Sequence, residues 1–286
     1  MKGVHLHPSG LRIHIAGPWP FITRRSYMLA GRRIVWQARQ HRKGLARAAR
    51  ALENAPVAFW QTQAYNWGTG ALFALGSLLF LAGSLLSLLP AGAGLAATPI
   101  NLVFFSGSIP FTLAGYLQHF QAANQSAFTL DPKGSTAPRH ISLIGWHPHS
   151  AGWLSTFCQF VGTVAFNVNT FDPLVVGAGW EAQDLAVWLP GMIGSVLFLA
   201  SGYLAFVETA HRYWSWRPWQ LDWQIVFINL LGCVAFMAAS TLAYVPSGGE
   251  AWWIADLANI LLGLGALGFF LGAALMMRES AAAAKG

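Results

Sequence analysis

Charge and cysteine are both scarce in this chain. Lys, Arg, Asp and Glu together make up 9% of its 286 residues, whereas soluble domains average about 25%. Such a low share of charge excludes a soluble globular enzyme and a disordered chain. Two cysteines, neither in a CxxC or similar spacing, exclude a secreted disulfide scaffold. With 55% hydrophobic residues and a mean hydropathy of +0.46, the chain is predicted to be a polytopic membrane protein.

Sequence signatures of catalysis are missing as well. The chain holds no nucleophile elbow, phosphate-binding loop, HExxH or dinucleotide fingerprint. Its longest hydrophilic connection, 118–152, has about 35 residues, which is too short for a catalytic domain. The first 20 residues are interrupted by three prolines and contain no seven-residue apolar core, so no cleavable signal peptide is expected. We therefore expect no enzyme activity and no cofactor.

Long apolar runs are what the sequence does have. About 20 mostly apolar residues cross the hydrocarbon core as a helix, and six stretches qualify. The third stretch carries Gln159, Asn167 and Asn169, which are costly in lipid unless they face other helices. The six expected transmembrane helices are 67–89, 98–117, 153–171, 185–207, 223–245 and 254–277.

Basic residues fall on one side of this arrangement. Of the 17 Lys and Arg, 11 precede the first span, and the others lie in alternate connections and in the tail. Because short loops rich in Lys and Arg stay in the cytoplasm, both termini are predicted to be cytoplasmic in a bacterial inner membrane. The connections without any Lys or Arg are 90–97, 172–184 and 246–253.

Three copies of one hairpin emerge when the spans are aligned on a glycine. The odd spans share the pattern W-x8-G-x3-F, and the even spans share a glycine followed four residues later by phenylalanine. On a helix these two positions lie about 40° apart, in one narrow stripe typical of close helix packing. The shared glycines are Gly76, Gly107, Gly162, Gly194, Gly232 and Gly265. The motif tryptophans, expected in an interfacial belt, are Trp67, Trp153 and Trp223.

The expected fold is all-α, with six transmembrane helices in three tandem parallel hairpins. Cytoplasmic segments precede, separate and follow the hairpins. The hairpins cover 67–118, 153–207 and 223–277, and the other segments are 1–66, 119–152, 208–222 and 278–286.

Polar side chains in the spans are the candidates for helix packing or for a pathway. Gln159 and Asn229 lie three residues before a shared glycine, within its stripe. Asn101 and Asn259 lie six residues before one, at equivalent places in spans two and six. Asp256 is expected at the outer membrane interface.

Residues 27–53 are predicted to form a basic amphipathic helix. Seven cations against one acid, just before the first span, fit contact with anionic lipid headgroups, at about 1 kcal/mol per cation. A topology signal alone is the alternative, and no nucleic-acid partner is expected because no such fold accompanies the charges. Upstream, 4–7 and 11–15 alternate polar and apolar around Pro-Ser-Gly and predict a small β-hairpin. The seven cations are Arg32, Arg33, Arg39, Arg42, Lys43, Arg47 and Arg50.

All nine histidines lie on the predicted cytoplasmic side. The sharpest candidate metal pair is His147 and His149. Without a carboxylate or cysteine at ligand spacing, surface histidines are the favoured interpretation and no metal is expected.

Two apolar segments share one pattern of glycine, serine and phenylalanine: 76–84 reads GSLLFLAGS and 194–202 reads GSVLFLASG. Both resemble the hairpin of the small bacterial YrhK-like membrane domain. The run 39–45, RQHRKGL, is similar to sequences upstream of such hairpins. The family has no established activity, so the resemblance implies an architecture and no reaction.

Two functions follow as hypotheses. The first is a non-enzymatic membrane scaffold or interaction protein, with a second copy or another membrane protein as partner. The alternative is a transporter or channel for a small solute. The two hypotheses differ in where four carboxamide side chains lie, paired in helix contacts or lining a hydrated cavity. These side chains are Asn101, Gln159, Asn229 and Asn259.

Overall fold

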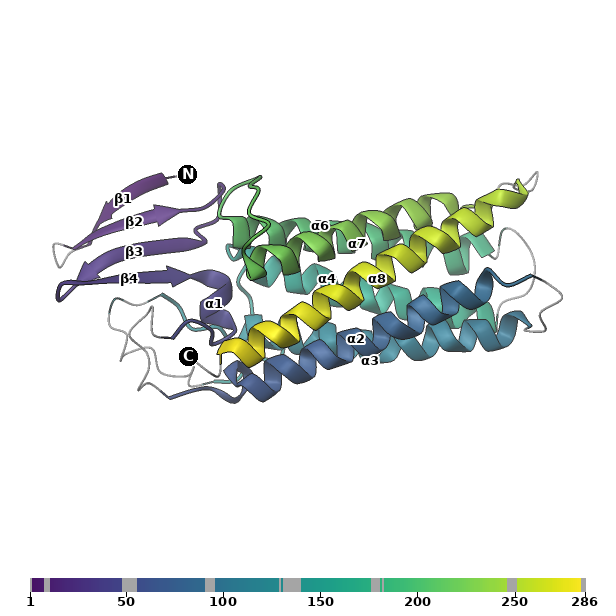
Figure 1. Ribbon diagram of the computed structural model, residues 1–286, viewed down its shortest axis with the longest axis horizontal. Helices are drawn as coiled ribbons and strands as arrows, with labels where there is room; N and C mark the ends of the chain where they lie inside the picture. The colour runs from purple at the N-terminus through teal and green to yellow at the C-terminus, as the bar shows by residue number, and fades with distance from the viewer. Residues whose placement is uncertain are drawn as a thin grey trace.

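The computed structural model describes residues 2–7, 11–47, 56–90, 96–128, 130, 140–175, 181, 183–245 and 251–283. Within these ranges, a small β-sheet lies at one end of a bundle of long helices (Figure 1). We call this end the sheet end and the opposite end the far end. Both chain termini lie toward the sheet end (Figure 1).

The sheet is an antiparallel meander in the order β1-β2-β3-β4. The small hairpin expected near the N-terminus is confirmed, because β1 and β2 pair with Val4 opposite His14. One face of the sheet buries Ile13, Tyr27 and Ile34 against Phe128 and Leu130 from the segment after α3. The strands are β1 (Lys2–Leu6), β2 (Arg12–Ala16), β3 (Arg24–Leu29) and β4 (Arg32–Gln37).

The basic amphipathic helix expected over 27–53 does not form in the described residues. Its place is taken by β3, β4 and the short helix α1 (Ala38–Arg42). Ala30 and Gly31 both have positive φ, 48° and 77°, as a two-residue hairpin turn requires. Tyr27 pairs with Ile34 across the strands, so the apolar residues follow a period of two rather than 3.6.

Six long helices follow the sheet. Two of them begin at side-chain caps, since Thr62 and Ser150 accept hydrogen bonds from the amides of Tyr65 and Trp153. The long helices are α2 (Gln63–Ser87), α3 (Ala97–Ala123), α4 (Ala151–Phe171), α6 (Leu189–Ala210), α7 (Leu221–Leu242) and α8 (Trp252–Ala283). Short helical turns are η2 (Phe59–Gln61), η4 (Asp172–Leu174) and η5 (Gln183–Trp188), which leads into α6.

Five helices in the described ranges are long and apolar enough to cross a membrane. They are α2, α3, α7, α8 and the continuous η5 and α6. The chain is therefore a multi-pass, mostly helical membrane protein, as expected, with a sheet of which the sequence predicted only the first hairpin. α4 does not meet the same hydropathy criterion, and it is the helix that carries Gln159, Asn167 and Asn169.

The six long helices form a closed ring. α2 packs against α3, α3 against α4, α4 against α6, α6 against α7, α7 against α8, and α8 returns to α2. The helices run side by side along the long axis of the molecule (Figure 1). The core of the protein lies inside this ring.

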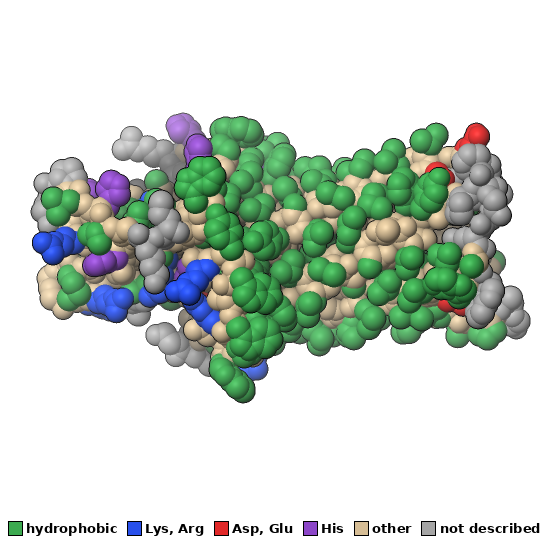
Figure 2. Space-filling view, turned by 90° about the horizontal axis from the view of Figure 1, so that it is seen from above, with side chains coloured by type: hydrophobic (Ala, Val, Ile, Leu, Met, Phe, Trp, Pro, Cys, Tyr) green, Lys and Arg blue, Asp and Glu red, His purple; other side chains and the backbone are tan. Residues whose placement is uncertain are grey.

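The outer surface of the ring is apolar between two differently charged ends. On the face shown in Figure 2, Lys and Arg gather at the sheet end, and Asp and Glu lie at the far end. Exposed tryptophans occur in the segments that connect helices at the sheet end. Trp146, Trp214, Trp216 and Trp219 are 75%, 60%, 65% and 93% exposed, which is typical of an aromatic belt at a membrane interface.

The motif tryptophans do not form the expected belt. Trp67 is half exposed, but Trp153 and Trp223 are buried. Their indole N–H groups donate to the carbonyls of Ile144 and Ser215 in the connecting segments. Trp153 and Trp223 therefore hold the connecting segments against the helix ends and do not face lipid.

Candidate functional site

Glycines bring the helices together in pairs. A Cβ placed on Gly76 would lie 2.8 Å from the carbonyl oxygen of Gly107, and one on Gly107 would lie 3.1 Å from that of Gly76. Two further pairs have the same reciprocal contact, so helix backbones touch at three places. The three pairs are Gly76 with Gly107, Gly162 with Gly194, and Gly232 with Gly265.

A cluster of six phenylalanines fills the centre of the ring. Each lies four residues after a shared glycine, is 3–6% exposed, and contacts other members with ring centroids 4.9–6.4 Å apart. The void at the cluster is about 10 Å³, at the lower limit for a single water. Three hydroxyl groups also line this void, those of Ser77, Ser108 and Thr163, and each donates to a carbonyl of its own helix. We call the six residues the phenylalanine cluster: Phe80, Phe111, Phe166, Phe198, Phe236 and Phe269.

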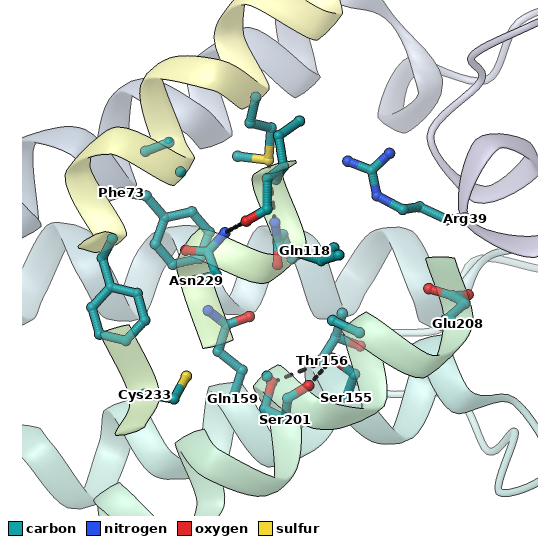
Figure 3. Close-up of a pocket in the computed structure, with 18 of the residues that line it drawn as sticks. Arg39, Phe73, Gln118, Ser155, Thr156, Gln159, Ser201, Glu208, Asn229 and Cys233 are labelled. Carbon is teal, nitrogen blue, oxygen red and sulfur yellow. Dashed lines mark hydrogen bonds between the residues drawn. The ribbon is translucent and has the colours of Figure 1, made fainter. Parts of the chain in front are cut away.

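The first cavity, here the sheet-end cavity, lies between this cluster and α1 (Figure 3). Its volume is about 90 Å³. Phe111, Phe198 and Phe269 belong to its apolar lining. The neutral polar side chains that line it are Gln118, Gln121, Ser155, Thr156, Gln159, Ser201 and Asn229.

Several amide groups of this cavity have hydrogen-bonding capacity left over. Within the described part of the chain, the Gln159 amide has no hydrogen-bond partner. Gln118 donates to the Met276 sulfur over 3.5 Å, and Asn229 donates to the Ile225 carbonyl of its own helix. Gln121 does pair across helices, since its amide donates to the Asn66 side chain of α2 at 3.1 Å. The predicted carboxamides Gln159 and Asn229 have no such partner on another helix in the described residues. They offer donors and acceptors to the cavity.

Ion pairs between α1 and the ends of two long helices lie at the sheet end of the cavity. Arg42 of α1 holds Glu208 of α6 through two hydrogen bonds of 2.6 and 2.9 Å. Arg39 holds Glu279 of α8 in the same bidentate manner, at 2.5 and 2.8 Å. Lys43 follows α1 and lies 3.3 Å from Glu279. These cations are 5–7% exposed. We call residues 38–43 the roof, because their cations connect the sheet-end termini of α6 and α8.

Burial of these cations overturns part of the expected lipid contact. Arg39, Arg42 and Lys43 are engaged with carboxylates inside the protein, and buried groups do not reach headgroups. Arg32 and Arg33 are exposed at the start of β4, next to the turn at the tip of the sheet and away from the helices (Figure 1). Two further members of the predicted set are Arg47, which is half-buried, and Arg50, which lies outside the described residues.

Among the cations of the roof, Lys43 has a markedly lowered pKa. Burial lowers the pKa of its ammonium to about 8, with Glu279 raising it and the neighbouring Arg39 and Arg42 lowering it further. The carboxylate that Lys43 contacts is already held by Arg39 on both oxygens. Lys43 is thus the least compensated charge at this cavity.

The second cavity, here the far-end cavity, lies beyond the phenylalanine cluster and has a volume of about 480 Å³. Asn101 and Asn259 line it, together with Asn169, whose amide donates to the Val187 carbonyl at 2.8 Å. Phe166 of the cluster borders it. The four predicted carboxamides therefore separate into two sets, Gln159 and Asn229 at one cavity and Asn101 and Asn259 at the other.

The remaining predicted residues lie outside both cavities. Asp256 is exposed near the far end of α8. His147 Nε2 donates to the Ala123 carbonyl at 3.1 Å, and His149 is exposed. In the described residues, no group of three or more His, Cys, Asp or Glu is arranged to hold a metal ion.

Sequence reasoning missed the partners of the roof. Glu208 and Glu279 are separated from their arginines by 166 and 240 positions, and no local pattern links them. Gly152 was missed as well. A Cβ there would lie 2.4 Å from the Glu208 carboxylate and would also clash with Arg42. The available signal was the rarity of acids in the apolar helices, which makes each one a candidate for pairing.

Comparison with family models, with curated proteins and with solved structures finds no match for this chain.

Proposed function

We propose that this protein is a membrane transporter or channel for a small polar solute, with its pathway along the axis of the helix ring. One observation carries the proposal: two cavities lined by carboxamides lie on either side of the phenylalanine cluster, where the void narrows to about 10 Å³. Hydrophobic constrictions of this kind close pathways by excluding water. We propose no enzyme activity.

We further propose that all six long helices cross the membrane, as three parallel hairpins. α4 belongs to the set because its polar residues face the interior, with Gln159 at one cavity and Asn169 at the other. Polar groups that line a cavity do not bear the cost of contact with lipid. The reciprocal glycine pairs support the repeat, since each joins one odd and one even helix. The likeness to YrhK-like hairpins is part of this proposal.

The orientation proposed places the sheet end in the cytoplasm of a bacterial inner membrane. Basic residues at the sheet end and acidic residues at the far end support it (Figure 2). The exposed tryptophans between the helices and the sheet then lie at the inner interface. Contact of this surface with anionic lipid remains part of the proposal, through residues other than the cations of the roof.

Flux through liposomes that contain the purified protein tests the pathway. The change is Phe198→Ala combined with Phe236→Ala, which removes two rings from the phenylalanine cluster. Entry of small solutes, measured by light scattering with urea, glycerol and sodium acetate, should rise about tenfold or more over the wild-type protein, because water enters the widened constriction.

Phe105→Ala is the matched control. Phe105 is in α3 and contacts Phe171, outside the cluster, so its truncation should leave flux unchanged. Equal flux in all three proteins and in empty liposomes would contradict the pathway and favour the scaffold hypothesis.

A further inference from the structure

Lys43 is a buried cation with few partners. Its side chain is 7% exposed, and in the described part of the chain its ammonium contacts one group, Glu279 Oε2 at 3.3 Å. That oxygen already accepts a hydrogen bond of 2.8 Å from Arg39. An ammonium has three donors, and a buried charge is costly unless it is fully hydrogen-bonded. Lys43 therefore has unused donors at the wall of the sheet-end cavity.

The charges around Lys43 favour an anion. The groups that act on it are Arg39 and Arg42 on the same segment and Glu279 on α8. Glu208 pairs with Arg42 in addition, so three cations, Lys43 among them, meet two carboxylates here. A monovalent anion in the cavity would balance the remaining positive charge and complete the hydrogen bonds of the ammonium.

Neutral donors and apolar surface complete the site. The free amide of Gln159 and the weakly bonded amide of Gln118 line the same cavity, and phenylalanine rings form its opposite part. At about 30 Å³ per water-sized group, a volume of about 90 Å³ admits about three such groups. A short organic anion with a polar head and a small apolar tail fits this space and this lining.

We propose that the sheet-end cavity binds a small monovalent carboxylate, with Lys43 and the amides of Gln118 and Gln159 as its donors. The assignment rests on the proposed pathway and names its class of solute. Binding to the cavity does not require the phenylalanine cluster to open, so the two proposals are tested by different measurements.

Equilibrium binding of radiolabelled acetate to the purified, full-length protein in detergent tests the site. We expect saturable binding to the wild-type protein at constant ionic strength. Lys43→Met should lower the affinity about tenfold or more, as expected for loss of a charged hydrogen bond. Arg33→Met removes an exposed cation of β4 and should leave the affinity unchanged.

A pH series separates a role of Lys43 in binding from a role in folding. Burial lowers the pKa of Lys43 to about 8, so acetate binding should fall as the pH rises through this value. Lys43→Arg should retain binding at about pH 9.5, because arginine stays charged. The wild-type protein and Lys43→Arg share all other charged groups of this region, so a difference between their pH profiles reports on position 43. These groups are Arg39, Arg42 and Glu279 beside Lys43, and beyond them Glu208 on α6 and Asp222 on α7.

The outcomes distinguish the two proposals. Absence of saturable acetate binding, or equal binding by the wild-type protein and Lys43→Met, overturns the anion site while leaving the pathway open to another solute. Saturable binding without any flux in the phenylalanine variants keeps the site and overturns the pathway. If Lys43→Met does not fold, Gln159→Leu takes its place and should weaken acetate binding several-fold.

Discussion

At the residue scale, glycine determines how closely the helices approach. The motif spacing alone predicted that six glycines share a face with phenylalanine, because both positions follow from helix geometry. Which helix each glycine meets was not predictable, since the partner depends on how the hairpins close. The contact of Gly76 with the carbonyl of Gly107 involves backbone on both sides, and backbone atoms cannot move aside as a side chain can.

Gly76→Ala is therefore expected to destabilise the protein by about 1–3 kcal/mol, the usual cost of overpacking. Its Cβ would lie 2.8 Å from the Gly107 oxygen and 2.9 Å from Phe111 Cβ. Gly68→Ala, in the same helix, is the control, since its Cβ meets nothing within 4 Å. That variant should be neutral or more stable by about 0.5–1 kcal/mol. Melting temperatures in detergent measure both, and equal shifts would contradict the glycine contact.

Charged residues show where sequence reasoning stops at this scale. A run of cations before an apolar span is typical of a solvated or headgroup-facing surface. Here Arg39, Arg42 and Lys43 are buried instead, because Glu208 and Glu279 lie at helix ends that reach the same place. The acids were visible in the sequence, but the pairing depends on contacts more than 160 positions apart.

At the element scale, the helices were easier to predict than the strands. Apolar runs of membrane length have few alternatives, and the structure has a long helix at each of them. Residues 24–37 carry four arginines among apolar side chains, a pattern that fits a basic helix as well as a hairpin. The structure has strands here. The hairpin turns at Ala30 and Gly31, and Tyr27 and Ile34 are buried opposite each other.

The sheet is joined to the helices at His211, the left-handed C-cap of α6 with φ 58°. The Thr23 hydroxyl lies 2.9 Å from His211 Nδ1. Burial lowers the pKa of His211 to about 4, Arg24 and Arg217 lower it as well, and Glu208 raises it. Since the neutral form is favoured in the folded protein, its stabilising effect is present above about pH 6.5 and is lost as the pH falls toward 4.

Acid should therefore loosen the sheet from the helices. Hydrogen exchange of β2 and β3, corrected for the intrinsic pH effect, should show less protection at about pH 4.5 than at about pH 7. His211→Asn keeps a residue that tolerates positive φ but cannot take up a proton, so its protection should change less. The same pH dependence in this variant and in the wild-type protein would contradict the role of His211.

At the scale of the whole molecule, closure of the helix ring brings the phenylalanines of the repeated motif together in one cluster. Each helix brings one phenylalanine to the centre, and polar side chains of α3, α4 and α7 line a cavity on either side of it. The sequence predicted the stripe and the equivalent carboxamides. It did not predict closure of the ring by α8 against α2, without which the same residues would be an ordinary packing face.

The most direct test of this account is the accessibility of the two cavities from opposite sides of the membrane. Cysteines replace Gln159 and Asn259, one at a time, in a protein in which Cys158 and Cys233 are changed to alanine, and a charged, membrane-impermeant thiol reagent is applied to each side. We predict that the cysteine at 259 reacts only from outside and the one at 159 only from the cytoplasmic side. Reaction of both cysteines from the same side, or of neither from any side, would contradict a pathway closed by the phenylalanine cluster.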